Sequence, residues 1–179
     1  MSIYFAADST AQHSAGVGAS SAGKVLDLQQ YQTTGSISHS SNTFTDIASF
    51  SLNLTPQTNS KVLISFCGSK GATTTNPVRF RPVRTIGGSA TALGMQSTAD
   101  WQGNYATMGN YLGGDWSNQI LHVAFQWIDV SPGGNGSTTI NYKLQWAINS
   151  GTAYLGQSSP ASIIQRAGGH QFYVMEIGA

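Results

Sequence analysis

Apolar and polar side chains alternate along much of this chain with a period of two. The alternation is clearest in residues 50–54, 62–67, 121–128 and 140–147. Successive side chains of a β-strand point to opposite faces, so these segments are predicted to be half-buried strands. No segment carries the i, i+3, i+4, i+7 spacing of an amphipathic helix over three turns. The pattern therefore predicts an all-β protein.

Shorter segments rich in β-branched and aromatic residues add further strand candidates, at residues 25–31, 78–86, 153–155, 162–165 and 171–177. Clusters of Gly, Pro, Asn and Ser predict turns at residues 55–60, 68–71 and 131–137. About eight strands in one chain favour an antiparallel β-sandwich of jelly-roll-like or related type. The order of the strands in the sheets does not follow from the sequence.

The first 23 residues differ from the rest, because they are almost all small or polar. Their larger apolar side chains are Ile3, Tyr4, Phe5 and Val17. Such a segment buries too little apolar surface to order itself. We therefore expect an extended N-terminal arm (residues 1–23) before the β-sandwich domain (residues 24–179). The arm either docks on a neighbouring molecule through its apolar end or packs along its own domain.

The interval from residue 87 to 118 is too long for an ordinary connection between strands. It is rich in glycine and contains Met95, Trp101, Tyr105, Met108, Tyr111 and Trp116. One interpretation is a functional loop whose Trp, Tyr and Met side chains form an interface, as these residue types often do. The other is that part of it is one more strand, with the aromatic side chains in the core.

Charged residues make up only 8% of the chain, and the formal net charge is +1. A protein that works as a monomer usually keeps more surface charge, so this composition favours an assembled protein. Nucleic acid is not an expected partner, since phosphate contacts need clustered Lys and Arg. A membrane is not expected either, because no stretch approaches the about 18 apolar residues of a spanning helix. The beginning of the sequence lacks the basic and apolar regions of a signal peptide, which predicts assembly in the cytoplasm.

None of the candidate nucleotide, nucleophile or metal sites in the sequence has the full set of residues that its chemistry requires. Residues 18–24 match the first seven positions of a phosphate-binding P-loop, but Val25 stands where Ser or Thr must bind magnesium, and no apolar strand precedes them. The single cysteine, Cys67, is expected to be a buried, inert thiol of a strand. The remaining candidates, the carboxylates and the four histidines, are dispersed: His13, His39, His122 and His170. We therefore expect no enzyme activity, no metal and no cofactor.

Three of the four arginines lie close together at Arg79, Arg81 and Arg84. On a strand, Arg79 and Arg81 share one face while Phe80 points to the other. They form either a solvated polar face or a contact with the carboxylates of a partner, which a guanidinium binds with two hydrogen bonds. Pro82 lacks the N–H that a central strand needs, so this strand is predicted to lie at an edge or to be bulged there.

From about residue 23 to its end, the chain resembles a family of small structural proteins encoded by tailed bacteriophages, many of them marine or cyanobacterial. The segments that carry the resemblance are strand and turn patterns: GKVL (23–26), SNTFTDI (41–47), FSLNLTP (50–56), SKVLI (60–64), RFR (79–81), INYKLQ (140–145) and MEIGA (175–179). The sequence departs from the family pattern at residues 101–116 and at Pro82. The resemblance implies a β-sandwich module of a virion fibre, tail or head, without catalytic residues.

Two function classes follow from the resemblance. In the first, the protein is a capsid decoration or cement protein that docks on the major capsid protein or other virion proteins through its arm. In the second, it is a tail or fibre module that binds a host surface glycan or protein through residues 87–118. In both cases we expect a homo-oligomer, and the resemblance implies a trimer. The expected interface residues are Ile3, Tyr4, Phe5, Arg79, Arg81, Arg84, Trp101, Tyr105, Met108, Tyr111 and Trp116.

Overall fold

The structure is a computed structural model that describes residues 22–74, 76, 78–93, 108–110, 120–157 and 169–179, with the backbone alone for 108–110. Every regular element in these residues is a β-strand. In chain order the strands are β1 (Val25–Thr33), β2 (Ile37–His39), β3 (Thr45–Leu54), β4 (Lys61–Ala72), β5 (Val78–Ile86), β6 (Ser89–Ala92), β7 (Met108–Asn110), β8 (Ile120–Asp129), β9 (Ile140–Ile148), β10 (Ala153–Leu155) and β11 (His170–Ile177).

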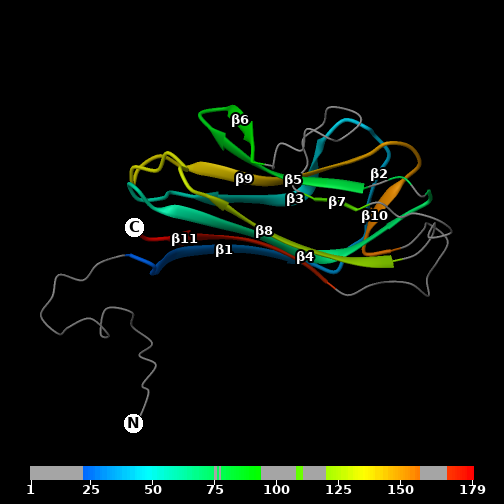
Figure 1. The fold of residues 1–179 in the computed structure, drawn as a ribbon, viewed down its shortest axis with the longest axis horizontal. Helices are drawn as coiled ribbons and strands as arrows, with labels where there is room; N and C mark the ends of the chain where they lie inside the picture. The colour runs from blue at the N-terminus through cyan, green and yellow to red at the C-terminus, as the bar shows by residue number, and fades with distance from the viewer. Residues whose placement is uncertain (1–21, 75, 77, 94–107, 111–119, 158–168) are drawn as a thin grey trace, which may run out of the picture.

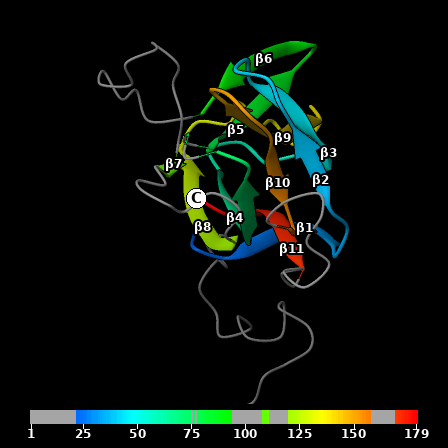
Figure 2. The same cartoon turned by 90° about the vertical axis from the view of Figure 1, so that its right-hand side faces the viewer.

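The strands form two antiparallel sheets that lie face to face (Figures 1 and 2). In the first, which we call sheet A, β11 pairs with β1 on one side and β4 on the other, and β8 pairs with the far side of β4. Past the start of β11, the short strand β10 pairs with the last residues of β4, and β2 pairs with the other side of β10. In the second, sheet B, the order is β3-β9-β5, and β6 and β7 share the outer edge of β5.

This pairing pattern is that of a jelly roll. The chain crosses from one sheet to the other after most strands, so the sheets read β1-β11-β4-β8 and β3-β9-β5-β6. The first and last strands, β1 and β11, are hydrogen-bonded neighbours, and Gly178 bonds to Gly23 and Lys24 at the same end of sheet A. An eight-stranded sandwich of two Greek keys has this arrangement. The predicted all-β, jelly-roll-like sandwich is confirmed.

A row of aromatic rings fills the space between the sheets. Phe66 of β4 lies 5.8 Å from Phe50 of β3 and 5.7 Å from Phe80 of β5, measured between ring centroids, and Phe80 in turn stacks on Trp146 of β9 at 6.3 Å. All four side chains are buried, as the period-two pattern requires. Each large ring removes roughly 150–250 Å² from water, so this row provides much of the stabilisation between the sheets.

Two expectations for β4 are wrong. The predicted turn at residues 68–71 is part of the strand, which continues to Ala72. Gly68 is there because the ring of His170 occupies its side-chain position: a Cβ would lie 2.6 Å from His170 Nδ1. Cys67 is exposed rather than buried, because it points out of sheet A while Phe66 points in.

The segment from residue 87 to 118 contains two short strands in its described part, β6 and β7. Neither contains an aromatic residue, and Trp101, Tyr105, Tyr111 and Trp116 lie outside the described residues, so the predicted burial of the aromatic side chains stays a prediction. The candidate strand at residues 162–165 lies outside the described residues. β9 pairs with β5 across Pro82 without a register shift, so the predicted bulge is wrong. On the other side of β5, β7 begins opposite Phe80 and β6 ends opposite Val83. Pro82 therefore lies where β6 ends: its carbonyl oxygen accepts the backbone N–H of Leu93 at 2.9 Å, so the missing N–H of Pro82 falls at the end of a short edge strand rather than between two long strands.

An ion pair connects the two sheets inside the sandwich. Arg84 of β5 points inward, and its Nη1 lies 2.9 Å from both carboxylate oxygens of Asp129 in β8 and 2.6 Å from the carbonyl oxygen of Ser131. Tyr142 of β9 donates its hydroxyl to Asp129 at 3.0 Å. Burial, and then the charge and hydrogen bond of Asp129, raise the pKa of the Tyr142 hydroxyl far above its usual value, so it remains a donor.

The opposite end of β4 contains a second buried polar group. The side chain of Lys70 is fully buried, and burial lowers its pKa to about 8. His170 lies nearby and is also fully buried; its Nδ1 accepts the backbone N–H of Ser69 at 3.4 Å. Burial lowers the pKa of His170 as well, because the charged imidazolium loses its hydration.

We expect Asp129→Ala to lower the free energy of unfolding by about 3 kcal/mol, because it leaves the partly buried Arg84 guanidinium without its counter-ion. The matched control is Asp46→Ala, which removes an aspartate–cation pair at the surface. Asp46 is 46% exposed and pairs with Lys143 at the surface, so its loss should cost less than about 1 kcal/mol. Urea denaturation of the three proteins measures both changes. Equal losses would show that burial of the Arg84 pair has no special weight.

The buried Lys70 predicts a pH-dependent stability. Its pKa is 10.5 in the unfolded chain and about 8 in the folded protein, so between these values the unfolded chain binds more protons. The free energy of unfolding should therefore rise by about 2 kcal/mol from pH 8 to pH 10. Above that range, the raised pKa of Tyr142 acts in the opposite direction. Denaturation across this pH range should show the slope in the wild type and in Lys61→Met, an exposed lysine of the same strand, but not in Lys70→Met.

Candidate interaction surfaces

Most of the residues expected at an interface fall outside the described part of the chain. These are Ile3, Tyr4, Phe5, Trp101, Tyr105, Tyr111 and Trp116. For Met108 the backbone alone is described, and it lies in β7 opposite Phe80. The remaining candidates, Arg79, Arg81 and Arg84, all lie on β5, but not on one face.

Arg79 and Arg81 lie together on the outer face of sheet B, as predicted, and Phe80 lies in the core between them. Both guanidinium groups lie over the ring of Phe44, with Cζ 5.5 Å from the ring centroid for Arg79 and 4.1 Å for Arg81. Arg79 also donates to the carbonyl oxygen of Asn42 at 3.3 Å. Cation–π contacts and hydrogen bonds within the chain thus already use both charges. Arg84, by contrast, points inward to Asp129.

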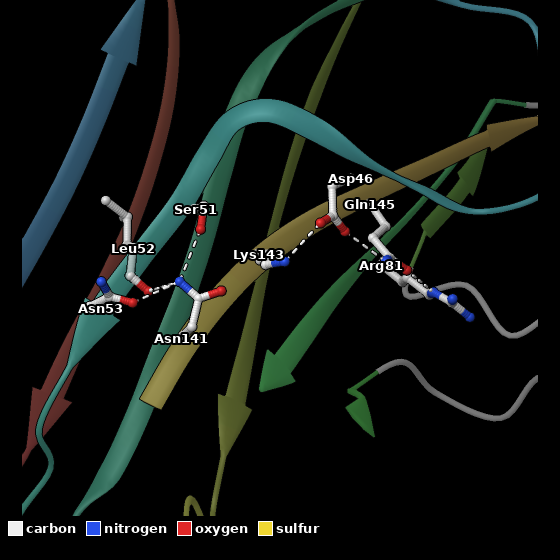
Figure 3. A network of polar contacts seen from close by, with 8 residues as sticks. All are labelled: Asp46, Ser51, Leu52, Asn53, Arg81, Asn141, Lys143 and Gln145. Atoms are coloured by element: carbon white, nitrogen blue, oxygen red, sulfur yellow. Dashed lines mark hydrogen bonds and ion pairs between the residues drawn. The ribbon is translucent and has the colours of Figure 1, made fainter. Parts of the chain in front are cut away.

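A chain of polar side chains crosses the outer face of sheet B (Figure 3). Arg81 donates to Gln145 at 2.9 Å, and Gln145 donates to one carboxylate oxygen of Asp46 at 2.8 Å. Lys143 reaches the other oxygen of Asp46, also at 2.8 Å. Burial raises the pKa of Asp46, but the two hydrogen bonds and the charge of Lys143 outweigh it and lower the pKa below its usual value. The carboxylate is therefore charged and fully paired at neutral pH.

The same face continues as an amide cluster towards the other end of β9. Asn141 donates to the hydroxyl of Ser51 at 2.9 Å, to the side-chain oxygen of Asn53 at 2.7 Å and to the carbonyl oxygen of Leu52 at 3.3 Å. Both rows are visible in Figure 3. We call the outer face of sheet B the polar face. Its hydrogen-bonding groups are largely paired within the chain, so it suits contact with water.

The outer face of sheet A has the opposite character. One apolar side chain from each of four adjacent strands lies in a single row across it: Leu28, Met175, Leu63 and Ile128. Leu28 is 48% exposed and Ile128 is 49% exposed. Val25, Leu26, Ile177 and Val130 extend the row at the same end of the sheet, and three of these are exposed large hydrophobic residues. We call this surface, together with the outward side chains of β1, β11, β4 and β8, the apolar face.

The apolar row exists because, at this end of β8 and β11, acidic side chains point into the core and the apolar side chains next to them point outward. Asp129 is buried while its neighbour Ile128 is exposed, and Glu176 is buried between the outward side chains of Met175 and Ile177. Glu176 accepts the backbone N–H of Gln57 at 2.7 Å, and Asp27 lies opposite Glu176 on β1. Acidic residues thus point inward here and apolar residues outward. Sequence reasoning missed this surface, although Leu26 and Leu28 flanking Asp27 were the available signal.

The described residues offer no arrangement typical of a metal or nucleophilic site. They contain no group of three or more His, Cys, Asp or Glu side chains that could hold a metal ion. Within the same residues, no helix is long and apolar enough to cross a membrane. Ser69 and His170 are neighbours, but the contact is from the Ser69 backbone N–H, and the two side chains leave opposite faces of sheet A. They therefore do not form a nucleophile–base pair.

Comparisons with known proteins give little guidance. No protein-family model matches the sequence, and no curated protein matches it significantly. A chain in the structure of infectious bursal disease virus, Gx strain, is similar over 87% of this chain, with 13% sequence identity and a TM-score of 0.32. The match spans 39% of that viral chain. A TM-score this low does not assign a function, so the two outer faces are the features that bear on function.

Proposed function

We propose that this protein is a non-enzymatic structural subunit of a virus particle, with a tailed bacteriophage as the source that the sequence resemblance favours. The observation that carries the proposal is the apolar face. Eight apolar side chains lie at one end of it, five of them exposed, in a chain with 8% charged residues. A soluble protein rarely keeps such a patch uncovered unless another molecule covers it.

The jelly-roll topology is consistent with this role. This architecture is used in viral capsids, but also in lectins and in cupins, so the fold alone does not decide between them. A lectin or cupin function needs a ligand site with convergent polar groups or metal ligands. The described residues show extended surfaces instead, one paired and polar, the other apolar and charge-poor.

Within the particle, we propose a capsid decoration or cement protein. It would be assembled in the host cytoplasm and would attach to the major capsid protein or to other virion proteins. The polar face would remain in solvent, the N-terminal arm would attach the chain to the head, and the apolar face would be covered by another subunit of the particle. The sequence of the arm supports this choice over a tail or fibre module, because the apolar residues Ile3, Tyr4 and Phe5 precede a run of small and polar residues that cannot form a core of its own. The alternative module would bind a host glycan or protein through residues 87–118.

The proposal predicts that particles produced by cells encoding this chain contain it in many copies on the head. Mass spectrometry of purified particles and a cryo-electron microscopy map test the content and the position. A chain lacking residues 1–20 should fold normally by circular dichroism but be depleted from the particles. Absence of the full chain from purified particles would refute the proposal, and density on the tail would favour the alternative. An unfolded truncated chain would show that the arm belongs to its own core.

We also propose that the protein is a homotrimer whose contacts include residues 87–118. Trp and Tyr are frequent at interface centres, because their rings remove large areas from water at a small entropic cost. Trp101→Ala and Trp116→Ala should therefore reduce the trimer to a smaller species in multi-angle light scattering. A mass unchanged by both substitutions would leave these residues as core or as a surface for another molecule.

A further inference from the structure

The apolar face has a chemistry that restricts what can cover it. Of the outward side chains on β1, β11, β4 and β8, Lys61 is the one with a formal charge at neutral pH. A partner recognised by charge, such as a nucleic acid or an acidic peptide, would find almost nothing to bind there. The covering surface must therefore be apolar and poor in charge itself.

The face combines an apolar end with an adjacent polar row, and apolar and polar surface of this kind occur together in protein interfaces. Beside the apolar row lies a polar row formed by Gln30, Tyr173, Ser65 and Gln126, which are cross-strand neighbours. Gln126 donates to the Tyr173 hydroxyl at 3.5 Å. A shallow hollow lies over this row and the next, lined by Ser65, Cys67, Ala124, Gln126, Gln171 and Tyr173. The apolar row is thus bordered by groups able to form hydrogen bonds at a rim.

The size of the face also fits a stable contact. Four strands spaced about 4.8 Å apart and about nine residues long give a flat footprint of roughly 19 by 30 Å, or about 570 Å². Protruding side chains raise the accessible area above the flat footprint. The face therefore approaches the roughly 800 Å² that each partner contributes to a standard interface.

We propose that the apolar face packs against the apolar face of a second copy of this chain, across a two-fold axis. It is the one extended surface in the described part of the protein that has the required chemistry. A two-fold contact is self-complementary, so the apolar row of one copy meets the apolar row of the other, and no opposite charges are needed. Two sheets can pack in this way at about 10 Å, as the two sheets of a sandwich do. The proposal uses the face that carries the proposed function and names the partner.

The test is a pair of substitutions at the two ends of the apolar row, Leu28→Glu on β1 and Ile128→Glu on β8. Both side chains are about half exposed in the single chain, so the fold tolerates the change. The two-fold contact would bury four carboxylates, and the outward side chains of these strands supply one cation per copy, Lys61, so at least two carboxylates would lack a counter-ion. A two-fold contact between two of the proposed trimers closes a hexamer. We expect the dissociation constant of this contact to rise by about 100-fold or more, and the mass of the assembly to fall by half, from hexamer to trimer, in sedimentation and light scattering. The described strands of residues 87–118, β6 and β7, belong to sheet B and not to this face.

Two matched variants serve as controls. Ala48→Glu adds the same charge at an exposed position of β3 in sheet B and should leave the mass unchanged. Leu28→Met keeps the row apolar and should keep the contact. A nitroxide attached to Cys67, the single cysteine and an exposed residue of the apolar face, should give one defined distance between copies by pulsed electron paramagnetic resonance. The double Glu variant should lose that distance while its circular dichroism and melting temperature stay close to the wild type.

A wild-type chain without a two-fold contact in solution, or a mass that the double variant leaves unchanged, would overturn the inference. If the contact disappears on removal of residues 1–20 and not in the double variant, the arm forms it instead, which also overturns the proposal. A chain that remains free of this contact yet is present in purified particles would refute the two-fold contact and leave the proposed function standing. Its apolar face would then be covered by another particle protein.

Discussion

The ion pair between Arg84 and Asp129 is the constraint on which the surface of this protein depends. It joins β5 of one sheet to β8 of the other inside the sandwich, with Tyr142 as a further donor. Side chains of a strand alternate strictly, so an inward Asp129 places Ile128 outward. The same relation holds on β11, where the inward Glu176 places Met175 outward. Burying acids at this end of sheet A therefore exposes a row of apolar side chains.

The two outer faces consequently have different roles. On the polar face, Asp46, Lys143, Gln145 and Arg81 pair with one another, so contact with water costs little and a partner gains little. On the apolar face, exposed side chains such as Leu28 gain roughly 25 cal/mol for each Å² removed from water. Association by this face requires no complementary charge, which suits a chain with few charged residues. The self-association and the virion role that we propose would both depend on this property.

The middle of the sandwich supports this asymmetry. The rings of Phe50, Phe66, Phe80 and Trp146 hold the sheets together through contacts that do not depend on either end. Buried polar groups, Asp129 at one end and Lys70 at the other, cost stability unless they are paired or neutral. The stability that the aromatic core provides can offset this cost. The outer face of sheet A can therefore remain apolar without loss of the fold.

The sequence alone determined the strand class, the turns at residues 55–60 and 131–137, and the shared face of Arg79 and Arg81, because these follow from local spacing. The sequence did not determine which of the alternating side chains of each strand point into the core. It predicts a strand at residues 25–31 without assigning an inward face, and Leu28 is exposed because pairing with β11 and the buried acids decides which side chains point inward. Gly68 reads as a turn residue, yet it lies within β4, where the ring of His170, distant in sequence, needs the space. The local period of two determines that side chains alternate between the two faces of a strand. Which set faces the core depends on contacts between residues far apart in the chain, and only the tertiary structure decides those contacts.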